Sequence, residues 1–99
     1  MQNQDPFRIP IEDSLDLHAF RPGDIPSVVE DYINAANEAG LTEVRLIHGR
    51  GRGVQRGIVQ KALERHPLVL RFFDDGASHL GATIAILTPQ KHRKPNVAE

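Results

Sequence analysis

Hydrophobic and polar residues follow regular intervals over most of the chain, and these intervals predict four strands and two helices. Residues 14–18, Ser-Leu-Asp-Leu-His, alternate polar and apolar side chains, which is typical of a short, half-buried strand. Residues 42–48 begin with the same alternation and end in an apolar run before a histidine. Two further β-rich runs, 68–73 and 83–87, are separated by Asp-Asp-Gly and more loop residues, so they are expected to form a terminal hairpin.

Two helices are predicted between these strands. In residues 25–39 apolar side chains recur at helical spacing, Asp24 is a candidate N-cap, and Gly40 is a natural stop. Residues 54–66 show a second helical pattern. The order is therefore β-α-β-α-β-β. Right-handed crossovers would place both helices on one face of a four-stranded mixed sheet. This is a two-layer α/β sandwich whose other sheet face is partly open.

Length and composition indicate one small globular domain. The chain has 99 residues, of which 39% are hydrophobic and 25% charged. We expect a domain at 14–88, an N-terminal tail or strap at 1–13, and a polar tail at 89–99. The absence of cysteine excludes a disulfide framework, a thiolate zinc site and a cysteine nucleophile.

No apolar run approaches about 18 residues and no secretion signal is present, so a cytoplasmic protein without a membrane partner is expected.

Two histidines lie at the ends of two predicted strands, His18 after the first and His48 after the second. Ligands bind at the carboxyl ends of parallel strands, so these imidazoles would lie side by side if the two strands are neighbours. Asp16 shares a strand face with His18, about 7 Å away by strand rise, where it could orient the imidazole or hold a hydrated cation. Together with Arg45, Asp16 and His18 would lie on the open sheet face.

A glycine-rich loop that suits phosphate follows His48. Gly49, Gly51 and Gly53 permit close backbone approach, and the next helix begins with unpaired N–H groups. Forked donors for phosphate oxygens come from Arg50, Arg52 and Arg56. The loop is not a Walker loop, because it lacks Gly-Lys-Ser/Thr. It is not a dinucleotide fingerprint either, because Val54 stands at the place of the third glycine.

Each of these features also has a purely structural explanation. A strand-end histidine is often a hydrogen-bonding residue of the fold, and a glycine-rich turn with arginines can be a solvated loop. Asp16 alone could be an ordinary strand-edge carboxylate. The functional interpretation rests on the expectation that both histidines, the loop and the arginines lie at one edge of the sheet.

The net charge of −1 does not by itself suggest a polyanionic partner. The distribution of charge along the chain does suggest such a partner. Residues 1–43 carry a net charge of −7, residues 44–73 carry +6, and residues 74–99 carry 0. The positive charge surrounds the glycine loop and the second predicted helix, where a phosphate backbone would have to lie. Local, modest and salt-sensitive binding of nucleic acid is therefore predicted.

The pattern resembles the Smr (small MutS-related) domain over roughly residues 14–88. The resemblance rests on Leu-Asp-Leu-His at 15–18, Val-Arg-Leu-Ile-His-Gly-Arg-Gly at 44–51, and Gly-Ala-Thr at 81–83. It implies a two-layer sandwich similar to the C-terminal domain of a bacterial translation initiation factor. It also implies nicking or cleavage of DNA or RNA, with binding to branched substrates proposed for some members. The positions that match the family motifs are Asp16, His18, His48, Gly49 and Gly51.

The sequence departs from the family pattern in two places. Ala19 and Phe20 follow His18 where the family usually has glycine, which adds bulk beside the histidine. Residues 78–80 replace the usual glycine pair before the last strand, and only Gly81 is kept. Larger family members carry an ATPase that 99 residues could not supply, so we expect a stand-alone Smr protein, as a monomer or a homodimer.

Three functions fit these observations. In a small endonuclease, the loop and arginines would hold phosphate while His18 and His48 act as general base and acid, with Asp16 orienting His18. RNA could supply its 2′-hydroxyl as nucleophile. On DNA a water must attack, which favours a divalent cation, Mg²⁺ or Mn²⁺, held by Asp16 and a histidine. The alternatives are a non-catalytic nucleic-acid-binding module and a binder of free nucleotide or a small phosphorylated ligand. We favour the endonuclease, because phosphate binding alone does not need the Asp16, His18 and His48 set.

Overall fold

The computed structural model describes residues 11–49, 53–77 and 81–89. The elements in chain order are β1 (Ser14–Asp16), the 3-10 turn η2 (Pro22–Asp24), α1 (Ile25–Glu38), β2 (Glu43–Ile47), α2 (Val54–Arg65), β3 (Val69–Asp74) and β4 (Ala82–Leu87). This order confirms the predicted β-α-β-α-β-β arrangement. It differs in the short 3-10 turn and in the first strand, which ends at Asp16 rather than at His18.

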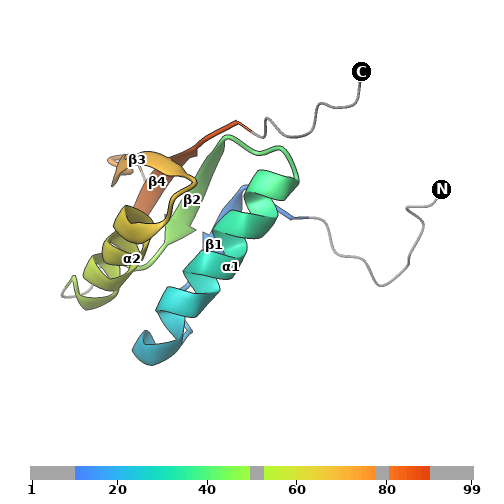
Figure 1. Ribbon diagram of the computed structural model, residues 1–99. Helices are drawn as coiled ribbons and strands as arrows, with labels where there is room; N and C mark the ends of the chain where they lie inside the picture. The colour runs from blue at the N-terminus through green and yellow to red at the C-terminus, as the bar shows by residue number, and fades with distance from the viewer. Residues whose placement is uncertain (1–10, 50–52, 78–80, 90–99) are drawn as a thin grey trace, which may run out of the picture.

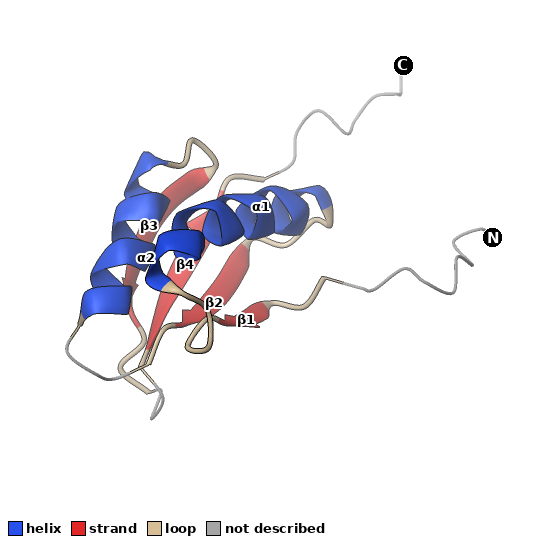
Figure 2. Cartoon of the chain, turned by 90° about the horizontal axis from the view of Figure 1, so that it is seen from below, coloured by secondary structure: helices blue, strands red, loops and turns tan. Residues whose placement is uncertain are grey.

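The four strands form one mixed sheet in the order β1-β2-β4-β3, and both helices lie on the same face of it (Figure 1 and Figure 2). The predicted two-layer sandwich is therefore confirmed. β1 pairs with β2 in parallel, whereas β4 is antiparallel to both of its neighbours. Consequently β1, β2 and β3 run in the same direction, and their carboxyl ends reach one edge of the sheet.

The core lies between the sheet and the two helices. On β2, Val44 and Leu46 are buried whereas Arg45 is exposed, which is the alternation that the sequence shows. Fully buried apolar side chains come from both layers: Leu17, Ile25, Val29, Ile33, Leu46, Val59, Leu63 and Ala85. Helix α1 ends at Glu38. Gly40 follows it with a φ of 89°, in the left-handed region, which lets Leu41 N–H reach Ala36 O at 3.0 Å.

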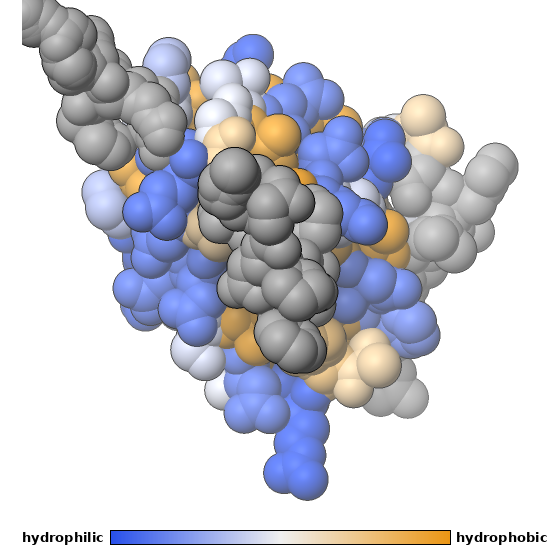
Figure 3. Space-filling view, turned by 90° about the vertical axis from the view of Figure 1, so that its right-hand side faces the viewer, coloured by the Kyte–Doolittle hydropathy of each residue, from blue (hydrophilic) through white to orange (hydrophobic). Residues whose placement is uncertain are grey.

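One face of the molecule is predominantly polar. In Figure 3 hydrophilic side chains cover most of the visible face, and hydrophobic ones show between them in small groups. Among the described residues no helix is long and apolar enough to cross a membrane, since α1, the longer of the two, has 14 residues.

Candidate functional site

One edge of the sheet brings together chain segments that are far apart in the sequence. β1 and β2 are joined there by the hydrogen bond from Leu17 N–H to Ile47 O, at 2.7 Å. The N–H groups of His48 and Gly49 both donate to Gly81 O, at 3.0 and 3.1 Å. These bonds hold the ends of β1 and β2 beside the start of β4. The predicted residues Asp16, His18 and His48 accordingly lie at or next to this edge.

Asp16 and His18 form an exposed hydrogen-bonded pair. Asp16 Oδ1 lies 2.6 Å from His18 Nδ1 and also accepts the His18 backbone N–H at 3.0 Å. The His18 and Asp16 side chains are 66% and 51% exposed. Because an ionised carboxylate can only accept, Nδ1 carries the proton, and Nε2 of the neutral ring keeps its lone pair. No described residue forms a hydrogen bond with that Nε2.

The hydrogen bond from the His18 ring, helped by the backbone N–H, holds the pKa of Asp16 below its ordinary value of 3.8. His18→Ala should therefore raise this pKa. The pair contributes stability above about pH 4, and the contribution is lost as the pH falls through the lowered pKa. Carbon-13 titration of the side-chain carboxyls by NMR checks this, with the exposed Asp31 of α1 as an internal control. If His18→Ala leaves the titration midpoint of the Asp16 carboxyl unchanged, the hydrogen bond between the two side chains does not form in solution.

His48, in contrast, is buried, with 5% of its surface exposed. Its Nδ1 lies 3.0 Å from Gly49 O, and its Nε2 lies 2.9 Å from Thr83 Oγ1. A carbonyl can only accept, so Nδ1 donates, and Nε2 of the neutral ring must then accept the Thr83 hydroxyl proton. Both ring nitrogens are therefore occupied inside the fold.

The bonds of His48 continue into a polar network between the sheet and α2. Thr83, which is fully buried, accepts from Gln60 Nε2 at 2.9 Å. The second N–H of the same amide donates to Asp74 Oδ1, also at 2.9 Å. These bonds fix the ring of His48 and link it, through Thr83 and Gln60, to Asp74 at the end of β3.

His18 and His48 follow the ends of the adjacent strands β1 and β2, but their rings occupy different environments. A Cβ placed on Gly49 would lie 3.9 Å from Cβ of His18, which shows how close the two chain segments run. The ring of His18 is exposed, whereas that of His48 is buried and bonded to Thr83. Although their backbones are close, only the ring of His18 is open to a ligand, whereas the ring of His48 is enclosed by the fold.

The described part of the glycine loop has the backbone conformation that the sequence predicts. Gly49 and Gly53 have φ values of 94° and 85°, a region that side chains other than glycine rarely adopt. Gly53 caps α2 without a side chain, and Gly57 N–H makes the first bond of the helix, to Gly53 O at 2.9 Å. The N–H groups of residues 54–56 then point from the helix start, as in an anion site. The predicted phosphate ligands Arg50, Gly51 and Arg52 lie outside the described residues.

Arg56, expected to bind phosphate, forms a bidentate ion pair with Asp74. Its Nε and NH2 donate to the two carboxylate oxygens at 2.9 and 2.8 Å. The Arg56 guanidinium, with Gln60, lowers the pKa of Asp74, and the carboxylate raises the pKa of Arg56. A phosphate at Arg56 would have to compete with this carboxylate.

A second basic side chain of the positive segment also has an acidic neighbour. Arg45 Nε lies 2.8 Å from Oδ2 of Asp75, whose side chain is 7% exposed. The approach is close enough for an ion pair but lacks hydrogen-bond geometry. Together with the Arg56 pair, it shows that acids immediately after residue 73 offset part of the +6 charge.

Gln60, Asp74 and Thr83 were not predicted as site residues, although Thr83 belongs to the Gly-Ala-Thr stretch on which the family resemblance rests. Two of them carried a signal in the sequence: Thr83 is a hydroxyl within an otherwise apolar strand, and Asp74 is a charged residue directly after an apolar, β-rich run. Gln60 lies on α2 with no distinguishing pattern around it. Their partners are 14 to 35 residues away along the chain, which no local pattern reveals.

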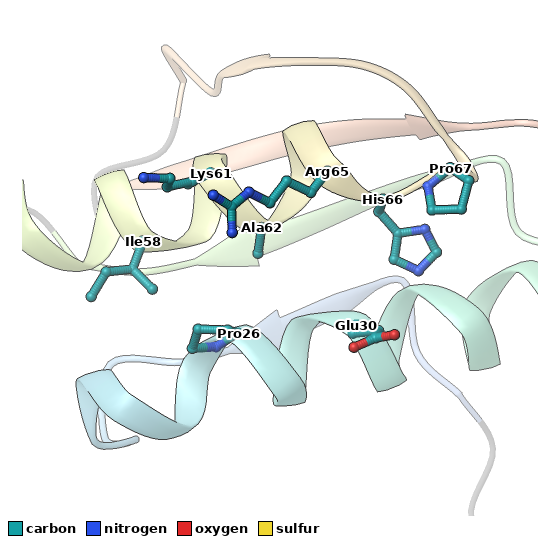
Figure 4. A pocket seen from close by; sticks show the side chains of 8 residues that line it. All are labelled: Pro26, Glu30, Ile58, Lys61, Ala62, Arg65, His66 and Pro67. Atoms are coloured by element: carbon teal, nitrogen blue, oxygen red, sulfur yellow. The ribbon is translucent and has the colours of Figure 1, made fainter.

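A groove of about 540 Å³ lies elsewhere, between α1 and α2, and none of the predicted site residues lines it (Figure 4). Its lining includes Ile58, Lys61, Arg65 and His66. His66 Nδ1 accepts the Leu68 N–H at 3.1 Å, which gives this helix-end histidine a structural bond. Within residues 11–49, 53–77 and 81–89, no three histidine or acidic side chains cluster as metal ligands.

Comparisons with known proteins point to one family. The family model described as Smr domain matches residues 15–88. Endonuclease MutS2 of Caldicellulosiruptor saccharolyticus is 38% identical over 76 residues, and that of Halalkalibacterium halodurans is 38% identical over 79. These matches cover 75% and 78% of this chain but only 10% of each relative. The crystal structure of the Smr domain of Thermus thermophilus MutS2 matches with a TM-score of 0.72 and 29% identity, over 79% of this chain and all of that one.

Proposed function

This chain belongs to the Smr domain family, and from that premise we propose that it binds nucleic acid and cleaves phosphodiester bonds at the edge that carries Asp16 and His18. The observation that carries the proposal is the exposed Asp16–His18 pair, in which a carboxylate holds Nδ1 and leaves Nε2 of the neutral ring as an acceptor. Binding alone would not require such a pair. The relatives named as endonucleases support the reaction class.

In the proposed reaction His18 is the general base. Its Nε2 accepts the proton of the nucleophile, a 2′-hydroxyl of RNA or a water attacking DNA, while the oxygen of the nucleophile forms a bond to phosphorus. Asp16 stabilises the imidazolium that results and keeps the ring in the required tautomer. The bond from phosphorus to the leaving oxygen breaks, and that oxygen takes up a proton from a solvent water while the His18 imidazolium returns its proton to solvent.

We assign His48 a positioning role in place of the general-acid role that the sequence suggested. Its two ring nitrogens bond to Gly49 O and Thr83 Oγ1 within the fold, so neither faces a substrate. The ring instead fixes the residue at which the glycine loop begins. The phosphate would be held by the N–H groups at the start of α2 and by Arg56 once it leaves Asp74.

A non-catalytic nucleic-acid-binding module is the second candidate. The burial of His48 favours it, because His18 is then the only exposed imidazole that the described residues offer at this edge, and cleavage needs two proton transfers. In this case the same edge would hold the phosphate backbone without cleaving it.

Binding and cleavage by the wild-type chain separate the candidates. Labelled single-stranded RNA, duplex DNA and branched DNA are incubated with the protein in Mg²⁺, in Mn²⁺ and in EDTA, and binding is followed by fluorescence anisotropy. Salt-sensitive binding with cleavage products in at least one condition supports the nuclease. Binding without products in any condition supports the module. No binding to any substrate would overturn both.

Asp74→Asn should increase the affinity for nucleic acid roughly two- to fivefold, because it releases Arg56 from its bidentate ion pair. Anisotropy titrations at two salt concentrations measure the change. Glu64→Gln is the matched control, because it removes an equal charge from α2 and Glu64 forms no ion pair with a described residue. Equal gains from both variants would show that net charge is the cause, and not the release of Arg56.

A further inference from the structure

Phe20 is a large apolar side chain that remains 38% exposed beside the proposed site. It stands two residues after His18, in the turn that follows β1. Most exposed apolar residues need no explanation. Phe20 differs because it stands two residues after the proposed general base, in the same turn.

Two hydrogen bonds fix the backbone of Phe20 from opposite sides. Its N–H donates to Leu17 O at 3.0 Å, which closes the turn at the end of β1. Its carbonyl oxygen accepts from Gln55 Nε2, on the first turn of α2, at 3.1 Å. Phe20 therefore bridges the strand end that carries His18 and the helix start at which phosphate is proposed to bind.

A second exposed apolar side chain lies on that same helix turn. Val54, the first residue of α2, is 60% exposed and precedes the Gln55 that bonds to Phe20. Apolar surface is thus left open where the rest of the site is polar or charged. The apolar component of a nucleic acid is the face of a base.

We propose that Phe20 is a stacking subsite for an unpaired nucleobase next to the phosphate at His18. This inference rests on the proposed function and adds its substrate class, a single-stranded or extruded nucleotide. Aromatic side chains bind bases of any sequence through their faces. In an intact duplex those faces are covered by neighbouring base pairs, so Phe20 would select for nucleotides that are out of the stack.

Phe20→Trp provides a direct test, because the chain contains no tryptophan and the variant has a single indole fluorophore. A single-stranded oligonucleotide should quench its fluorescence, with the same midpoint as binding measured by anisotropy. Leu70→Trp is the matched control, since Leu70 is 62% exposed but lies near the start of β3, away from the carboxyl-end edge. Equal quenching of both variants, or no quenching of Phe20→Trp by an oligonucleotide that binds, would overturn the subsite.

Phe20→Ala gives the second measurement. We expect about tenfold weaker binding to single strands and no change for a blunt duplex. The loss should disappear when an abasic nucleotide replaces the stacked base. An equal loss on both substrates would overturn the subsite and leave the proposed function intact, whereas a wild-type chain that binds no nucleic acid would end both. If Phe20→Ala does not fold, the fluorescence of Phe20→Trp decides.

Discussion

His18→Ala is expected to slow phosphodiester cleavage by a factor of about 100 to 10,000, the usual range for the loss of a general base. The reason is geometric. His18 is 66% exposed, its Nδ1 is held 2.6 Å from Asp16 Oδ1, and its Nε2 is bonded to no described residue. Binding should change little, because the imidazole is neutral when it acts as a base and contributes no charge to phosphate contacts.

Single-turnover cleavage with the enzyme in excess measures this effect, and anisotropy with the same substrate measures binding. Asp16→Asn should cause a smaller loss, because the amide no longer stabilises the imidazolium but leaves the ring in place. Asp31→Asn, an exposed change on α1, should leave the rate unchanged. A His18→Ala protein that cleaves at the wild-type rate would remove His18 from the reaction.

His48→Ala is expected to lower the free energy of unfolding by about 3 kcal/mol, the range found when a large buried side chain is removed and its hydrogen-bond partners are left unsatisfied. His48 is 5% exposed and bonds to Gly49 O and Thr83 Oγ1. Its removal would leave the Thr83 hydroxyl without an acceptor in a fully buried position.

Urea unfolding of wild-type and variant proteins measures this loss. His18→Ala is the control, because an exposed histidine should change the unfolding free energy by less than about 0.5 kcal/mol. Thr83→Val should cost about 1 to 3 kcal/mol, and combining it with His48→Ala should cost less than the sum because the two share one hydrogen bond. If His48→Ala keeps its stability but loses cleavage, His48 takes part in the chemistry, as the sequence suggested.

The helices and strands were readable from the sequence because their periods are set by the backbone. Val44 and Leu46 alternate with Arg45 on β2, and the structure buries the first two and exposes the third. Gly40 was expected to stop a helix, and it follows the end of α1 with a φ of 89°. The strand order was not readable, because inserting β4 between β2 and β3 depends on contacts between segments that are distant in the chain.

In the candidate site, too, contacts between residues close in the sequence could be predicted, whereas contacts between distant residues could not. Asp16 and His18 are two residues apart, and their hydrogen bond follows from local spacing that the sequence displays. The bonds of His48 to Thr83 and of Arg56 to Asp74 join residues 35 and 18 positions apart. Both pairs change a predicted role: His48 is buried against Thr83, and Arg56 is held in an ion pair with Asp74.

The sequence locates the charged residues along the chain but does not show which of them pair in space. The sequence alone located the positive charge in residues 44–73, and that segment includes α2 and the glycine loop. Only the tertiary structure brought Asp74 and Asp75 against Arg56 and Arg45. By itself the sequence determined the elements, the layered fold and the local Asp16–His18 pair, because backbone geometry imposes those periods over a few residues. The tertiary structure decided which side chains are buried, paired or free, because that depends on which distant strands become neighbours.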